Sequence, residues 1–142
     1  MKKKNYIDTA KRVIKTEADA VMNLTHQIRP DFEKLCERIL DTEGKLILMG
    51  IGKSGHIAQK ISATLSSTGT SSFFIHPTEA AHGDLGMISK HDSILILSNS
   101  GETKEIIEIL PSLKRSTSNI FTLTNNSEST IAKAGKISLV IN

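Results

Sequence analysis

The sequence of 142 residues has few of the features that mark secreted or membrane-bound proteins. It contains one cysteine, Cys36, so an internal disulfide is excluded, and this usage is typical of a reducing compartment. No apolar run approaches the length that spans a bilayer, and the amino terminus has no apolar stretch of the kind found in secretory signals. We therefore expect a cytoplasmic protein with no membrane contact.

Aromatic residues and a strong bias of charge are also lacking. There is no tryptophan, aromatic residues make up 4% of the chain, and the formal net charge is +3. Part of that charge comes from Lys2, Lys3 and Lys4, which we expect to form a solvated terminus. Without a basic stripe or aromatic residues that stack on bases, the sequence predicts no binding to nucleic acid.

Two amphipathic helices are expected before the first strand. Asp8 or Thr9 can cap the first helix, which we expect to reach about residue 28, and Pro30 suits the first turn of the second. Because a helix ahead of a sheet has no required place in it, we expect the first helix to pack against a second copy in a homo-oligomer, a dimer or a tetramer. The residues of the second helix that are expected to face inward are Phe32, Leu35, Cys36, Ile39 and Leu40.

From residue 44 onward, short apolar runs alternate with amphipathic stretches. This alternation predicts an α/β fold, a doubly wound five-stranded parallel sheet with the flavodoxin-like order 2-1-3-4-5 and N-terminal helices. We expect one domain over residues 1–142, with N-terminal helices at 1–43 and the α/β core at 44–142. The expected strands are 45–49, 71–75, 93–97, 119–123 and 137–141, and the expected helices are 54–67, 103–115 and 127–135, with a short helical or irregular piece near 78–85.

Residues 50–56, with the sequence Gly-Ile-Gly-Lys-Ser-Gly-His, form a glycine turn between the first strand and the next helix. Glycines let the backbone approach a ligand closely, and the free N–H groups of the helix start favour an anion, with phosphate as the first choice. The candidate ligands in this turn are Gly52, Lys53, Ser54, Gly55 and His56.

The same glycine spacing matches the dinucleotide fingerprint G-x-G-x-x-G. That fingerprint requires an acidic residue at the end of the second strand, where this sequence has His76 and Pro77. A nucleotide-dependent oxidoreductase therefore stays as one alternative, and the loop favours a phosphorylated metabolite.

A second polar turn follows the third expected strand. Residues 98–103, Ser-Asn-Ser-Gly-Glu-Thr, supply three hydroxyl groups, an amide and backbone N–H groups, a set of donors suited to phosphate oxygens. In the order 2-1-3-4-5 the first and third strands are neighbours, so this loop and residues 50–55 are expected to line one crevice. The candidate ligands in the second loop are Ser98, Asn99, Ser100, Gly101 and Thr103.

Three segments in order, residues 50–56, 76–86 and 98–103, resemble the sugar isomerase (SIS) domain of arabinose-5-phosphate isomerases. The resemblance runs from about residue 10 to the end of the chain. It implies an enzyme that interconverts ribulose 5-phosphate and arabinose 5-phosphate and feeds synthesis of the lipopolysaccharide sugar Kdo. It implies no cofactor, and no pair of histidines has the helical spacing of metal ligands, so no metal site is predicted.

The resemblance also implies roles for single residues. Ser54, Ser98, Ser100 and Thr103 would hold the phosphate, Lys53 and Glu105 match family positions implicated in catalysis, and His82 matches a position near the sugar. Glu105 is then the candidate acid/base group, and Lys53 the candidate stabiliser of the developing oxyanion or a counter-charge of the phosphate.

The chain departs from the family pattern at its end. In the family, the domain continues past the fifth strand with helices that carry another acidic residue and a histidine, and two CBS modules usually follow. We therefore expect the 142-residue chain to bind the sugar phosphate and to isomerise it poorly. A sugar-phosphate-sensing domain without catalysis is the second alternative.

Overall fold

Five short strands form one parallel sheet in the computed structural model, which describes residues 5–141. The predicted lysine terminus at residues 2–4 lies outside the described residues. The strands run in the order β2-β1-β3-β4-β5, which confirms the predicted fold class and sheet order. Their bounds are β1 Leu46–Met49, β2 Ser72–Phe74, β3 Ser93–Leu97, β4 Ile120–Thr124 and β5 Ile137–Val140.

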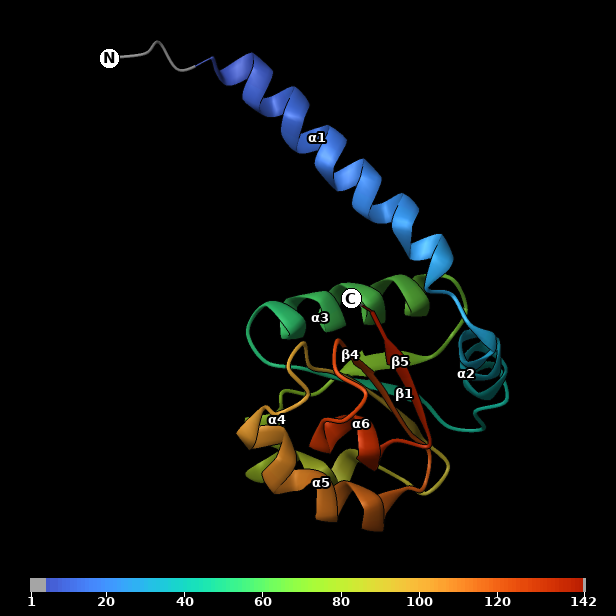
Figure 1. The fold of residues 1–142 in the computed structure, drawn as a ribbon. Helices are drawn as coiled ribbons and strands as arrows, with labels where there is room; N and C mark the ends of the chain where they lie inside the picture. The colour runs from blue at the N-terminus through green and yellow to red at the C-terminus, as the bar shows by residue number, and fades with distance from the viewer. Residues whose placement is uncertain (1–4, 142) are drawn as a thin grey trace.

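Helices cover both faces of the sheet (Figure 1). The helices α2 Pro30–Leu40 and α3 Lys53–Ser67 lie on one face, and α4 Pro77–Ala81, α5 Lys104–Ser116 and α6 Thr130–Ala134 lie on the other. Successive strand residues point to opposite faces, so Leu46 and Leu48 pack beneath α2 and α3 while Ile47 and Met49 pack beneath α4 to α6. Burial on both faces explains why β1 and β3 are uninterrupted apolar runs.

The α6 helix is shorter than predicted because Ser129 caps it. Ser129 accepts a hydrogen bond from the backbone N–H of Ala132, so the helix begins at Thr130 rather than at 127. The predicted piece near 78–85 is divided into α4 and a short 3₁₀ helix, Asp84–Met87. Gly83 separates the two with a φ of 139°, which is a conformation that favours glycine.

The helix α2 buries fewer of its apolar residues than the sequence predicts. Leu35 is buried, and Cys36 and Ile39 are half-buried, as expected of a stripe that faces the sheet near β5. Phe32 and Leu40 are exposed, so the prediction that they face inward is wrong. They lie in the first turn and at the last residue of α2, beyond the turns that contact the sheet.

The helix α1, Tyr6–Asn23, projects from the body and buries none of its residues (Figure 1). Its cap is Asn5, whose side chain accepts a hydrogen bond from the N–H of Asp8, so the predicted caps at Asp8 and Thr9 are wrong. Both residues lie inside the first turn, where an N-cap cannot be. The helix gives way to a 3₁₀ turn at Leu24–His26 and does not reach residue 28.

One buried carboxylate joins two segments of backbone by hydrogen bonds at the amino edge of the sheet. Asp92 is 5% exposed, and its two oxygens accept hydrogen bonds of 2.7 Å from the backbone N–H groups of Lys45 and Ser89. Burial alone would raise the pKa of Asp92, but these hydrogen bonds outweigh it and hold the pKa below its ordinary value. A Cβ on Gly44 would lie 2.3 Å from a carboxylate oxygen of Asp92, so glycine is required there.

Candidate functional site

The two polar loops leave neighbouring strands at the same edge of the sheet. Met49 of β1 is paired with Ile96 of β3, so the strands end almost level, and residues 50–52 and 98–103 follow them directly. The helices that follow, α3 and α5, both begin at this edge and lie on opposite faces (Figure 1). The sheet therefore brings together the loops that the sequence analysis expected to share a crevice.

The first loop is built by close backbone contact. Gly52 is the N-cap of α3 with a φ of 59°, and a Cβ on Gly55 would lie only 2.8 Å from the carbonyl oxygen of Gly50. The first turn of α3 therefore rests directly on the end of β1, and its N–H groups, which have no partner within the helix, lie at the open edge. Around them, Lys53 and His56 are exposed, and Ser54 is half-buried.

The second loop is organised by its own side chains. Ser98 is 2% exposed; its hydroxyl accepts a hydrogen bond from the N–H of Gly101 at 3.1 Å and lies 2.8 Å from the Thr103 hydroxyl. The Ser100 hydroxyl accepts a hydrogen bond from the N–H of Glu102 at 3.2 Å. Asn99 is exposed. The hydroxyls of Ser98 and Thr103 thus shape the loop, a role that the sequence analysis did not assign to them.

Residues 124–131, which we call the β4–α6 brace, hold the second loop from behind. The carbonyl oxygen of Asn99 accepts hydrogen bonds from the Asn125 N–H and the Thr124 hydroxyl, at 3.0 and 3.2 Å. A carboxylate oxygen of Glu102 accepts a hydrogen bond of 2.7 Å from the N–H of Thr130. These contacts fix the loop against the strand beside it.

The brace also explains why residue 101 is a glycine. This glycine has a φ of 67°, and a Cβ added to it would lie 1.9 Å from the hydroxyl oxygen of Ser129. Its carbonyl oxygen accepts a hydrogen bond of 3.0 Å from the N–H of Ile131. The roles of Ser129 and Glu102 in holding the loop are not predicted by the sequence, because each contact spans 28 residues of chain. The sequence predicts only a helix over 127–135 at this place.

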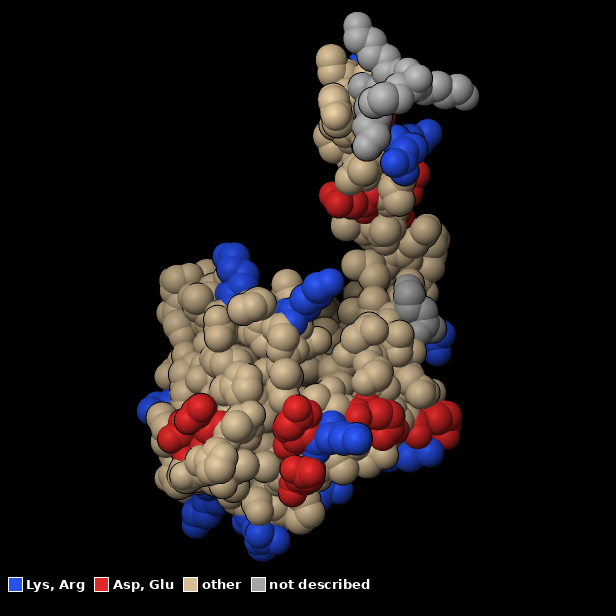
Figure 2. All heavy atoms as spheres, turned by 90° about the vertical axis from the view of Figure 1, so that its left-hand side faces the viewer, with Lys and Arg blue, Asp and Glu red and all other residues tan. Residues whose placement is uncertain are grey.

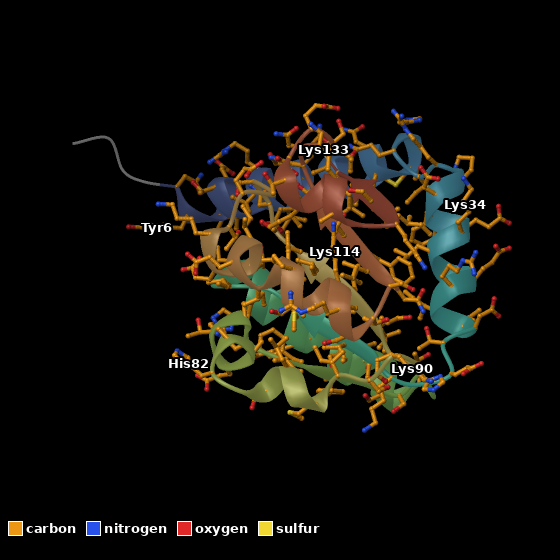
Figure 3. All side chains as sticks on the ribbon, turned by 90° about the horizontal axis from the view of Figure 1, so that it is seen from below. Tyr6, Lys34, His82, Lys90, Lys114 and Lys133 are labelled. Carbon is orange, nitrogen blue, oxygen red and sulfur yellow. The ribbon has the colours of Figure 1, made fainter. Side chains whose placement is uncertain are left out.

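The candidate catalytic side chains lie at the same edge. Lys53 is the first residue of α3, and Glu105 is the second residue of α5; both are exposed. Neither side chain has a hydrogen-bond partner among residues 5–141, so both are available to a ligand. His82 is exposed at the end of α4, and Figure 3 places it at the left of the molecule, the side on which α3 and α5 begin in Figure 1.

Figure 2 shows this edge of the molecule face on, with acidic and basic groups interspersed on it. His76, one of the histidines at this edge, has a structural role: its Nδ1 accepts a hydrogen bond from the N–H of Thr78 and caps α4. Within residues 5–141 no three His, Cys, Asp or Glu side chains are grouped so that they could hold a metal ion.

Two hollows lie at the opposite, amino edge of the sheet. One of about 560 Å³ is lined by Lys45, Ser71, Ser72, Phe73 and Met87, and one of about 260 Å³ lies next to it around Gly69 and Thr70. Both are remote from the glycine loops, so neither belongs to the candidate site. In the part of the chain that the structure describes, no helix is long and apolar enough to cross a membrane.

The model of the SIS domain family matches residues 39–142, which include the whole sheet and both loops. The chain belongs to the SIS domain family. The resemblance noted in the sequence is thereby confirmed at the level of the family, and the glycine loops are the loops of a SIS domain.

Curated relatives of this SIS domain are similar to it over almost its whole length. It is 50% identical over 135 residues to arabinose 5-phosphate isomerase KdsD of Pseudomonas aeruginosa. The matched stretch makes up 95% of this chain and 41% of the relative. It is 46% identical over 138 residues to arabinose 5-phosphate isomerase KdsD of Yersinia pestis, and this match makes up 97% of this chain and 42% of the relative. The chain thus spans about two fifths of the length of these relatives.

A solved structure of an Escherichia coli CFT073 protein in complex with arabinose 5-phosphate has the same fold. It superimposes with a TM-score of 0.92 at 40% sequence identity and covers 99% of this chain and 75% of the other.

Proposed function

We propose that this SIS domain binds the phosphate of a five-carbon sugar phosphate and belongs to an enzyme that interconverts ribulose 5-phosphate and arabinose 5-phosphate. The observation that carries the proposal is the pair of polar loops at the ends of β1 and β3, where helix N–H groups and hydroxyls lie together. The relatives named arabinose 5-phosphate isomerase and the neighbour in complex with arabinose 5-phosphate support the same substrate. A place in Kdo and lipopolysaccharide synthesis, and in the cytoplasm, follows from this proposal.

The chemistry is a transfer of one proton between adjacent carbons through an enediolate. In the aldose-to-ketose direction, the Glu105 carboxylate removes the C2 proton, and the electron pair moves toward the C1 carbonyl oxygen, which becomes negative. The Lys53 ammonium group stabilises that oxygen, and the proton of the C2 hydroxyl passes to it. Glu105 then returns the abstracted proton to C1, which leaves the carbonyl at C2 and gives the ketose. His82 is assigned to the sugar end, where it binds a hydroxyl of the substrate.

The phosphate part of the proposal is tested by titrating ribulose 5-phosphate and unphosphorylated ribulose into the protein. Because hydrogen bonds to a charged group contribute about 1.5–3 kcal/mol each, the phosphorylated sugar should bind at least tenfold more tightly. A Ser98→Ala/Ser100→Ala double variant should lose that difference, and Ser67→Ala, at the far end of α3, should keep it. Equal affinity for the two sugars would overturn the proposal.

The catalytic part is tested by following the release of the C2 hydrogen of arabinose 5-phosphate into solvent with the complete protein. We expect Glu105→Gln to slow this release by roughly 10²–10⁴ while the substrate still binds, because the amide keeps the shape and removes the basic oxygen. Glu108→Gln, one turn further along the exposed side of α5, is the matched control and should retain activity.

The same assay distinguishes the two alternatives that the sequence left open. Binding of the sugar phosphate without any hydrogen release by the unmodified protein would assign the domain to sensing rather than to catalysis. An active Glu105→Gln variant would place the base on another residue and leave the binding proposal intact.

A further inference from the structure

An acidic side chain lies within the loop that is proposed to bind phosphate. Glu102 is the only charged residue among residues 98–103. A carboxylate that pointed into the site would repel the phosphate, because like charges at short range raise the free energy of binding. The direction in which this carboxylate lies therefore decides what it contributes to the site.

The carboxylate of Glu102 is turned toward α6. One of its oxygens accepts a hydrogen bond of 2.7 Å from the N–H of Thr130, the first residue of that helix. The next N–H of the helix, from Ile131, donates to the carbonyl oxygen of Gly101 at 3.0 Å. The first two N–H groups of α6 therefore hold two consecutive residues of the loop.

The helix α6 is a firm support for these bonds although it is short. Its residues Ile131 and Ala132 are buried, as is its N-cap Ser129. The Ser129 hydroxyl accepts a hydrogen bond from the N–H of Ala132 and donates one of 2.7 Å to the carbonyl oxygen of Asn126. Because α6 is anchored in this way and Glu102 is exposed, the helix fixes the position of the loop.

The held segment leads directly into α5. Glu102 precedes Thr103, the N-cap of α5, and the first turn of the helix follows. That turn carries the N–H groups of Lys104 and Glu105, which have no partner within the helix, and it also carries the Glu105 carboxylate. A bond that fastens Glu102 to α6 therefore determines where the anion-binding N–H groups and the candidate base lie.

We propose that Glu102 is a positioning residue of the sugar-phosphate site and acts through α6. Its hydrogen bond to the Thr130 N–H holds the loop and the first turn of α5 in the geometry that binds phosphate and presents Glu105 to C2 of the sugar. The Glu102 carboxylate itself does not touch the substrate. This inference rests on the proposed function, since it concerns the same site.

The carboxylate is tested by steady-state kinetics with arabinose 5-phosphate on the complete protein. Glu102→Ala should raise KM about tenfold and also lower kcat, because the N–H groups and Glu105 lose their fixed position. Glu102→Gln keeps an oxygen that accepts the Thr130 N–H, so both constants should stay within about threefold of the native values. A variant with a native site and less folded protein would show a lower apparent kcat at an unchanged KM.

Two results of this comparison would overturn the proposal. One is a native KM in Glu102→Ala, which would show that the bond to α6 does not position the site. The other is a Glu102→Gln variant as impaired as Glu102→Ala, which would show that the charge matters rather than the hydrogen bond. Circular dichroism on each variant verifies that the fold is retained.

The donor of the hydrogen bond can be removed separately. Proline has no N–H and is well tolerated at the first position of a helix, which Thr130 occupies. Ser129 before it has φ −67° and ψ 157°, an extended conformation that a following proline accepts. Thr130→Pro should therefore raise KM as Glu102→Ala does, whereas Thr130→Ala, the matched control that keeps the N–H, should retain the native KM.

The double variant Glu102→Ala/Thr130→Pro shows whether the two residues act through one bond. Its KM should be no higher than that of the more impaired single variant, because the same interaction is lost in all three. Effects on KM that multiply in the double variant would overturn the proposal, since they would show that the two residues act independently.

The native protein separates a failure of this inference from a failure of the proposed function. If it neither binds ribulose 5-phosphate nor releases the C2 hydrogen, both are overturned. If it binds the sugar phosphate without releasing hydrogen, the same variants are compared by their dissociation constants, and the same order is expected. If the native protein is active and the variants depart from that order, this inference alone is overturned.

Discussion

The two loops of the candidate site are built in different ways. Residues 50–55 are shaped by backbone contact alone, with the first turn of α3 resting on Gly50, and none of their side chains makes a hydrogen bond within residues 5–141. Residues 98–103 are held by hydroxyls of their own and by the β4–α6 brace. The first loop offers free helix N–H groups, and the second offers a preformed shape.

This difference has a consequence for energetics. The contacts that form the second loop also join α5, α6 and β4, so damage to that loop should reduce both stability and binding. The first loop is joined to the rest of the molecule through β1 and α3, which are buried independently of the exposed turn. Damage there should reduce binding more than stability.

The largest effect is expected from Gly101→Ala, and Gly52→Ala, at the other loop glycine with positive φ, is its comparison. Gly101→Ala combines backbone strain with a collision against Ser129 and should lower the free energy of unfolding by about 2–5 kcal/mol. Gly52→Ala meets nothing within 4 Å, so only strain remains, about 1–2 kcal/mol. Urea unfolding measures both values, and equal losses would contradict the difference between the loops.

A substitution at the amino edge of the sheet should lower stability without changing ligand binding. Asp92→Asn removes a buried charge that accepts two backbone hydrogen bonds, and should lower the free energy of unfolding by roughly 2–4 kcal/mol while sugar-phosphate affinity is unchanged. Loss of affinity in this variant would show that the two edges are coupled.

The same carboxylate predicts a dependence of stability on pH. The pKa of Asp92 is lower in the folded chain than in the unfolded one, so its contribution is fully present above the unfolded pKa of about 3.9. It is lost as the pH falls from there through the lower folded pKa. Unfolding curves measured between neutral pH and pH 3 should show this decline in the native protein, and a smaller decline in Asp92→Asn.

The smallest effect is expected from the exposed part of the brace. Glu102→Ala removes the hydrogen bond to the N–H of Thr130 and should lower stability by about 0.5–1 kcal/mol, because solvent screens an exposed carboxylate. Its effect on affinity should be larger than that of Glu128→Ala, a control that breaks only a surface ion pair with Lys133. Identical affinities for the two variants would limit the brace to a structural role.

The sequence predicts the central strands β1 and β3 well because they are defined by burial. The bounds of β3 match the prediction, since Ser93–Leu97 is an apolar run closed by polar residues at both ends. The ends of helices are harder to predict from the sequence. Whether Asn5 or Asp8 caps α1 depends on the geometry of one turn, because both residue types are good caps. Phe32 and Leu40 are apolar, but their exposure depends on where the sheet ends.

The candidate site was predictable in position and less so in detail. Glycines and hydroxyls located both loops, because turn chemistry is local in sequence. The use of the Ser98 hydroxyl within the loop, and the support from Glu102 and Ser129, depend on contacts that only the folded chain brings together. The roles of Lys53, Glu105 and His82 in catalysis stay predictions.

The register between β1 and β3 also determines where the chain can tolerate insertions. Both loops are positioned by the pairing of Met49 with Ile96, so one extra residue in either strand would shift a loop by about 3.3 Å and turn its buried side chains to the wrong face. The turns at the amino edge, at Thr68–Ser71 and at Ser89–Asp92, lie a full strand length from the loops. Changes of length between related SIS domains should therefore accumulate in exposed positions of the turn after α3, whereas the segment from Leu46 to Gly55 should keep its length.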